Sequence, residues 1–362
     1  MPQAPDVFEH LQALLPLLAA YAQQQEDRAA AAEFLKTRLN SYSVFEADGL
    51  IASPDSVCRL FSALVPQRGT QGGTLFIPCC GTGHLAAALV QHADSRVVGQ
   101  DISPTARPYF LIRNLLAGNT FARYVGGNAI TQPLSRTETA LQQFDTVACQ
   151  PPFGFNAEGA ELLENDPYRR FDRGLPRRNS GDWLHICNCL AYAEPTHGVV
   201  MTLVTRATLF RVDVARGIRR RLVEENLLDA VIELPGGMLP GTAVSTALLI
   251  FKHSRRRKGV RLISAAAMGE KARRLVVLSD RDIERIRKAY ESDADEPGFA
   301  RTVAPADMAA QEDTWEVCRY ITPVAEADAA DSPEEQQAAI TRLRSELAAK
   351  QARLAELLAQ LQ

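Results

Sequence analysis

The sequence has little that would assign it to a simple class of protein. Its 362 residues contain seven cysteines, an odd number, and no Cys-x-x-Cys pair, so it predicts neither a disulfide framework nor a zinc site. Cys187 and Cys189 are expected to pack on one helix. No apolar run is long enough to span a membrane, and the stretch from Leu11 to Tyr21 lacks the basic segment of a signal peptide. We therefore expect a cytoplasmic protein with reduced thiols.

An excess of positive charge is also missing. The 40 Lys and Arg against 43 Asp and Glu leave a formal net charge of -3, so any contact with DNA must be local. Residues 168–178 contain five arginines in eleven residues, and this segment is interpreted either as a loop that contacts phosphates or as a solvated loop with surface ion pairs. The candidate DNA-binding residues are Arg169, Arg170, Arg173, Arg177 and Arg178.

What the chain does have is an alternation of buried strands and helices. With 46% hydrophobic residues it can bury a sizeable core. Apolar strand patterns at 199–204, 229–234 and 247–251 accompany a helical pattern at 212–225. This rhythm predicts a doubly wound α/β sheet with ligands at the carboxyl ends of its strands.

Three candidate ligand-binding turns follow predicted strands. A strand at 74–78 runs into Cys-Cys-Gly-Thr-Gly at 79–83, where glycines let a nucleotide approach the backbone and a helix N-terminus. A second strand at 96–100 ends in Asp101, at a spacing that suits a ribose hydroxyl. A third leads to Gly-Gly-Asn at 126–128, where Asn128 could reach an adenine. The purely structural alternatives are a helix N-terminal residue for Asp101 and a plain glycine turn at 126–128.

The fourth turn, Gln-Pro-Pro-Phe at 150–153, follows an apolar strand at 144–149. An amine conjugated to an aromatic ring is a poor nucleophile, so a methylating site must hold its N–H groups on acceptors. The amide oxygen of Gln150 and the carbonyl of Pro151 can supply them. Two prolines make the turn stiff, and Phe153 could stack on a base flipped out of a duplex. An ordinary strand-to-loop turn is the alternative.

The order of these turns resembles that of the N6-adenine DNA methyltransferases. The later blocks resemble the modification subunit of type I restriction-modification systems, and the resemblance covers roughly residues 45 to 360. These blocks include Ser-Gly-Asp-Trp-Leu-His at 180–185, Val-Ile-Glu-Leu-Pro at 231–235 and Arg-Tyr-Ile at 319–321.

The resemblance implies a seven-stranded methyltransferase sheet and S-adenosylmethionine-dependent methylation of a flipped adenine in DNA. It places the catalytic turn at Gln150, Pro151, Pro152 and Phe153. It places the cofactor at Pro78, Cys79, Gly81, Thr82, Gly83, Asp101 and Asn128. No metal is implied.

The chain departs from the family pattern at three positions. The family usually has Asp where this chain has Ile77 and Asn128, and Asn where it has Gln150. These departures favour an alternative function, a catalytically impaired relative that acts as a DNA-binding or regulatory assembly component. Methylation of rRNA or of a protein glutamine is a third possibility, because those enzymes also use Asn-Pro-Pro-aromatic turns.

Four segments are expected along the chain. Residues 1–45 form a short N-terminal helical segment, 46–265 the methyltransferase domain, 266–331 a connecting region and 332–362 a C-terminal coiled-coil-like helix. The last begins with a capping box and repeats apolar residues every seven positions. Ile340, Leu347, Leu354 and Leu361 form this seam. It is expected to join a specificity-subunit-like partner or a second copy, or to fold back on its own domain.

Overall fold

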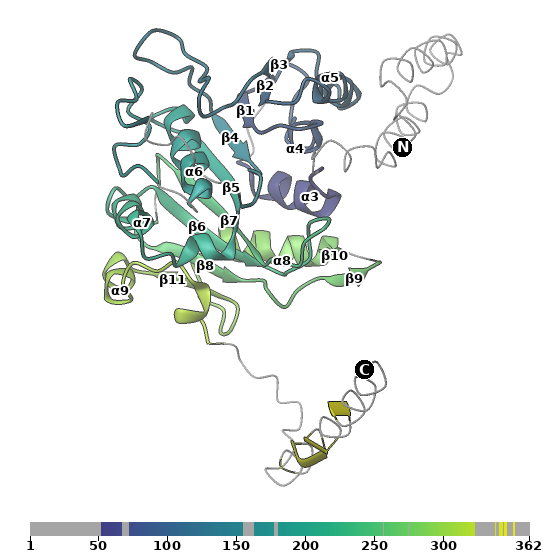
Figure 1. Cartoon of the computed structure of the whole chain (residues 1–362), viewed down its shortest axis with the longest axis vertical. Coiled ribbons are helices and arrows are strands. Elements are labelled where there is room, and N and C mark those ends of the chain that lie inside the picture. The colour runs from purple at the N-terminus through teal and green to yellow at the C-terminus, as the bar shows by residue number, and fades with distance from the viewer. Residues whose placement is uncertain are drawn as a thin grey trace, which may run out of the picture. The chain divides into compact units, whose positions relative to one another are not determined.

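The computed structural model describes residues 52–66, 72–154, 163–176, 180–255, 257–273 and 275–322, with isolated residues between 337 and 351. Its main sheet has nine strands in the order β11-β8-β6-β7-β5-β4-β1-β2-β3 (Figure 1). The strands are β1 Thr74–Pro78, β2 Arg96–Asp101, β3 Ala122–Gly126, β4 Thr146–Cys149, β5 Val199–Thr205, β6 Leu228–Leu234, β7 Thr246–Lys252, β8 Val260–Ser264 and β11 Ala300–Val303. The sheet exceeds the predicted seven strands because β8 and β11 extend one edge.

Most neighbouring strands are parallel. β1 pairs in parallel with β2 and β4, β2 with β3, and β4 with β5. β7 is antiparallel to both β5 and β6, and β11 is antiparallel to β8. The carboxyl ends of β1 to β4 therefore meet at one edge of the sheet, which is where ligands bind in folds of this kind.

Helices cover both faces of the sheet, and the strands alternate their side chains between two cores. Phe76 packs on the face of α6, with its ring 5.0 Å from that of Phe144 and 4.6 Å from that of Tyr192. Its neighbours Leu75 and Ile77 point into the core on the other face. The helices are α3 Asp55–Leu64, α4 His84–Ala88, α5 Ala106–Leu116, α6 Gly181–Tyr192, α7 Val214–Glu224, α8 Asp280–Glu291 and α9 Pro305–Ala310, with short 3-10 turns η3 Arg206–Leu209 and η4 Val317–Arg319.

Local sequence explains where two of the helices, α7 and α8, begin. Asp213 accepts a hydrogen bond from the backbone N–H of Ala215 at the start of α7. Ser279 and Asp282 form a reciprocal capping box at the start of α8. The predicted helix at 212–225 is confirmed as α7. The prediction that Cys187 and Cys189 pack on one helix is confirmed in α6, where both are buried.

Two compact units divide the chain, Met1–Thr322 and Pro323–Gln362, and each is described by itself. The part of the predicted connecting region that reaches Thr322 belongs to the first unit, because β11 pairs with β8 and α8 packs against the sheet. The predicted N-terminal helical segment and most of the C-terminal helix lie outside the described residues. Within the described part, no helix is long and apolar enough to cross a membrane.

Candidate cofactor and amine site

The turn after β1 is shaped by its glycines. The backbone φ angles of Gly81 and Gly83 are +49° and +86°, in the left-handed region that side chains disfavour. A Cβ at Gly83 would lie 2.9 Å from the Cα of Phe110, so only glycine lets this turn approach α5. A Cβ at Gly81 would meet nothing within 4 Å. The backbone of Gly81 therefore borders open space in which a ligand could lie.

Asp101 is hydrogen-bonded to both the turn after β1 and the turn after β3. Its Oδ2 accepts a hydrogen bond of 2.8 Å from the N–H of Gly81, and its Oδ1 accepts one of 3.0 Å from Ser103. Its backbone carbonyl accepts a 2.8 Å bond from the N–H of Gly127, in the third turn. The side chain thus orders the loops while remaining only half-buried. A contact with a ribose hydroxyl stays a prediction.

Asn128 uses its amide oxygen within the chain. The oxygen accepts hydrogen bonds from the N–H groups of Ile130 and Thr131, at 2.8 and 3.3 Å. This geometry fixes the turn after β3, as in the plain-turn alternative. The predicted contact with adenine would have to come from the amide nitrogen of Asn128 or from the neighbouring backbone.

The Gln-Pro-Pro-Phe turn carries an unpartnered buried acceptor. Among the described residues, the Oε1 atom of Gln150 is buried and has no hydrogen-bond partner. Leaving such an atom unsatisfied costs about 1–3 kcal/mol, which an arriving N–H group would recover. Pro151 is buried, Pro152 is exposed, and the half-buried Phe153 packs against the core that contains Ile77. Because β4 pairs with β1, this turn lies beside the cofactor turns.

Behind these turns lies a cluster of sulfur and imidazole groups. The Sγ of Cys79 is 3.7 Å from the Nδ1 of His185, and hydrogen bonding with Cys149 lowers the pKa of Cys79 against the opposing effect of burial. Burial alone would lower the pKa of His185, but the sulfur of Cys79 raises it overall. Burial raises the pKa of Cys149 well above its usual value.

The predicted arginine segment divides into three environments. Arg169 is exposed and pairs with Asp172 at 2.7 Å, and Arg173 pairs with Glu225 at 2.5 Å. Arg177 and Arg178 lie outside the described residues. Arg170 is 3% exposed and cannot reach a phosphate in this conformation, so its prediction as a DNA-binding residue is wrong.

Arg170 is instead a structural residue. It forms two hydrogen bonds with the carboxylate of Asp166, at 2.8 and 3.0 Å, and its Nη1 donates to the carbonyl of Ile130 and the amide oxygen of Asn188. The guanidinium also lies 5.1 Å from the centre of the Phe171 ring. These contacts hold the segment on α6 and on the loop after β3.

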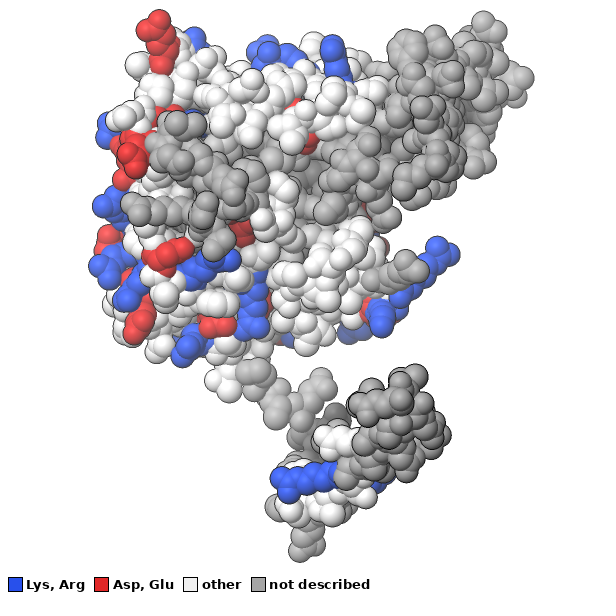
Figure 2. All heavy atoms as spheres, viewed as in Figure 1, with Lys and Arg blue, Asp and Glu red and all other residues white. Residues whose placement is uncertain are grey.

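The sequence reasoning missed a small basic hairpin. Strands β9 Glu270–Ala272 and β10 Leu275–Val277 form a two-stranded sheet that projects from the molecule (Figure 1). Lys271 and Arg273 are exposed there, without an ion pair among the described residues, and blue side chains stand out over this hairpin in Figure 2. The N–H of Val276 donates to the carbonyl of Gly237, 2.8 Å away, in the loop that follows β6.

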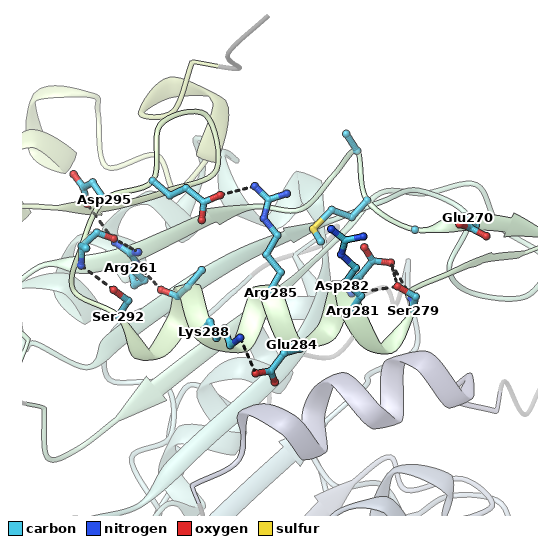
Figure 3. Close-up of a pocket in the computed structure, with 16 residues that line it drawn as sticks. Arg261, Glu270, Ser279, Arg281, Asp282, Glu284, Arg285, Lys288, Ser292 and Asp295 are labelled. Atoms are coloured by element: carbon cyan, nitrogen blue, oxygen red, sulfur yellow. Dashed lines mark hydrogen bonds and ion pairs between the residues drawn. The ribbon is translucent and has the colours of Figure 1, made fainter. Parts of the chain in front are cut away.

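A separate pocket of about 970 Å³ lies beside α8 (Figure 3). Several of its charged groups pair with one another: Arg261 with Asp295 at 3.2 Å, Arg285 with Glu296 at 2.5 Å and Lys288 with Glu284 at 3.6 Å. None of the predicted cofactor or catalytic residues lines it. We therefore assign the candidate site to the turns after β1 to β4.

The large, mostly parallel sheet with its turns at one edge is the fold of the class I S-adenosylmethionine-dependent methyltransferases. A protein described as a putative member of that class, from Listeria monocytogenes, superimposes with a TM-score of 0.54 at 16% identity, over 77% of this chain and 84% of the other. Residues 39–329 match the N-6 DNA Methylase family, and the chain belongs to it.

Relatives within this family are subunits of restriction systems. The chain is 25% identical to the methylase subunit of the type I restriction enzyme MjaVIII from Methanocaldococcus jannaschii, over 81% of this chain and 53% of that protein. The type I restriction-modification methyltransferase subunit from Streptococcus thermophilus superimposes with a TM-score of 0.70 at 22% identity, over 75% of this chain and 59% of that one. The chain thus spans little more than half the length of these relatives.

Proposed function

We propose that the chain is an S-adenosylmethionine-dependent N6-adenine DNA methyltransferase of the modification-subunit type. The observation that carries this proposal is the buried, unpartnered Oε1 of Gln150, at the end of β4 and beside the turns that follow β1 and β2. An acceptor in this position suits the N–H groups of an exocyclic amine. Family membership supports the reaction class, and the residue roles are part of the proposal.

In this proposal, different residues bind the cofactor, hold the amine and stack on the base. Gly81, Gly83 and Asp101 would hold S-adenosylmethionine, which supplies an electrophilic methyl group. The Oε1 of Gln150 and the carbonyl of Pro151 would accept the two N–H groups of the adenine amine and turn its lone pair toward that methyl. Phe153 would move from its contact with the core, or present its exposed edge, to stack on the flipped base.

The experiment that tests this function is transfer of tritium from labelled S-adenosylmethionine to DNA, scored as N6-methyladenine. Transfer in the presence of a specificity-type partner supports the enzyme. The alternative is a catalytically impaired relative, and Ile77 favours it: this side chain is 1% exposed and lies in the core, where the family usually has a carboxylate. DNA binding without transfer under any partner condition would favour the alternative.

Asp101→Ala is expected to abolish measurable cofactor binding. The change removes the acceptor for Gly81 and Ser103 together with the proposed ribose contact. Equilibrium dialysis with labelled S-adenosylmethionine measures the effect. Asp94→Ala is the matched control, because it removes an exposed carboxylate two residues before β2 begins, at the end of the strand opposite to Asp101. Equal binding by the Asp101 variant and the wild type would remove Asp101 from the site.

DNA contact is proposed for two pairs of basic residues. The first pair is Arg169 and Arg173, from the described part of the 168–178 segment. The second pair is Lys271 and Arg273, from the hairpin. Replacing either pair with alanine should weaken DNA binding and reduce the slope of log affinity against log salt by about one unit for each lost phosphate contact. Lys258→Ala is the control, because Lys258 is exposed and lies two residues before β8 begins, whereas the hairpin follows the other end of that strand. An unchanged slope would exclude that pair from the interface.

Assembly is proposed for the C-terminal segment. Deletion of the residues after Asp331 should leave the sheet folded and abolish association with a specificity-type subunit or with a second copy, since the apolar seam of the heptads would be lost. Light scattering of the full chain and the shortened chain, each alone and with the partner, measures the change. The same number of subunits per particle with and without the segment would contradict this role.

A further inference from the structure

Three possible metal ligands converge behind the cofactor turns, although they are distant in the sequence. Cys79 follows β1, Cys149 is the last residue of β4, and His185 lies in α6. Each offers one ligand atom, and the three atoms lie within 4.8 Å of one another. We propose that Cys79, Cys149 and His185 form a site for a thiophilic divalent cation, with zinc as the expected ion.

The spacing of the donor atoms suits a tetrahedral ion. With zinc–sulfur distances of about 2.3 Å and zinc–nitrogen distances of about 2.1 Å, neighbouring ligand atoms lie roughly 3.6–3.8 Å apart. The Sγ of Cys79 and the Nδ1 of His185 are separated by 3.7 Å. Small rotations of the side chains would bring the third donor to the same spacing.

The balance of charge also suits zinc. Cys149 is 0% exposed and His185 4%, so an unbalanced ion would be costly here. Two thiolates neutralise one divalent cation, and the neutral imidazole adds no charge. A water molecule that enters beside the partly exposed Cys79 can take the fourth position without changing this charge balance.

The position of the site gives the ion a structural role. Cys79 lies two residues before Gly81, and Cys149 comes directly before Gln150. An ion held by both cysteines and by α6 would tie the cofactor turn to the Gln-Pro-Pro-Phe turn. This inference concerns the fold beneath the site, so it does not depend on methyl transfer.

The test uses the full chain, reduced, stripped of metal and titrated first with Co²⁺ and then with Zn²⁺. We expect one Co²⁺ per chain, with thiolate-to-cobalt charge-transfer absorption and the intense visible bands of a tetrahedral site, both displaced by Zn²⁺. Zinc should also raise the melting temperature. Cys79→Ser and Cys149→Ser should each lower the affinity for Zn²⁺ at least about tenfold.

Cys187→Ser is the matched control, because Cys187 is buried in the same helix outside the cluster, and it should keep the wild-type affinity. Circular dichroism shows whether each variant is folded, and His185→Gln provides a third variant that leaves both cysteines in place. The proposal is overturned if the folded wild type gives no charge-transfer band, or if folded ligand variants bind as tightly as the control. It is equally overturned if mass spectrometry finds a Cys79–Cys149 disulfide in metal-free protein that zinc does not prevent.

Discussion

Arg170→Ala is expected to destabilise the protein by about 3–5 kcal/mol, because it leaves the carboxylate of Asp166 buried without its partner. The two side chains are only 2% and 4% exposed, and no other cation pairs with Asp166 among the described residues. The loss should appear as a lower midpoint in urea unfolding of the full chain, with an unchanged slope.

Arg169→Ala is the matched control, one residue away. Its side chain is 82% exposed, and its pair with Asp172 is expected to contribute less than about 1 kcal/mol. Adding Asp166→Asn to the Arg170 variant should recover part of the stability, because the uncompensated charge is removed. Equal effects of Arg169→Ala and Arg170→Ala would show that the buried pair contributes no more to the free energy of unfolding than the exposed pair.

Changes at Gln150 are expected to have the largest effect on methyl transfer. Gln150→Ala should lower the rate by about a hundred- to a thousandfold, the usual cost of losing one positioned acceptor or donor at the reacting group. Gln150→Asn should raise the rate about ten- to a hundredfold by restoring the shorter amide reach of the family, since ångström-scale misplacement has effects of this size. Tritium transfer to DNA in the presence of the partner measures both changes.

Gln143→Ala provides the control, since Gln143 is exposed before the other end of β4 and should leave the rate unchanged. Phe153→Ala should weaken transfer by removing the partner on which the base stacks. A fully active wild type with a slower Asn variant would mean that Gln150 is adapted to this site. Similar rates for wild type and Gln150→Ala would remove Gln150 from the reaction.

The strands around the site could be predicted from the sequence because each combines a short apolar run with a glycine or proline turn. Those at 74–78 and 199–204 match β1 and β5 closely. β8 and β11 were missed. β11 is only four residues long and only its first and last residues are buried, so its sequence shows neither an apolar run nor the alternation of a strand.

Residues whose roles depend on tertiary contacts could not be predicted in the same way. Arg170 looked like its exposed neighbours because composition does not show that Asp166, Ile130 and Asn188 surround it. Cys79, Cys149 and His185 follow no ligand spacing in the sequence, and only the pairing of β1 with β4 beneath α6 brings them together. The buried state of the Gln150 amide oxygen likewise depends on packing around the turn.

The central claim is that the turns after β1 and β2 form a working S-adenosylmethionine site beside Gln150. Calorimetric titration of the full chain with S-adenosylmethionine tests it most directly, because it requires neither DNA nor a partner. We predict a binding isotherm with one site per chain, and weak affinity because Ile77 stands where the family usually has a carboxylate. A folded protein that gives no heat change at millimolar S-adenosylmethionine would contradict the claim.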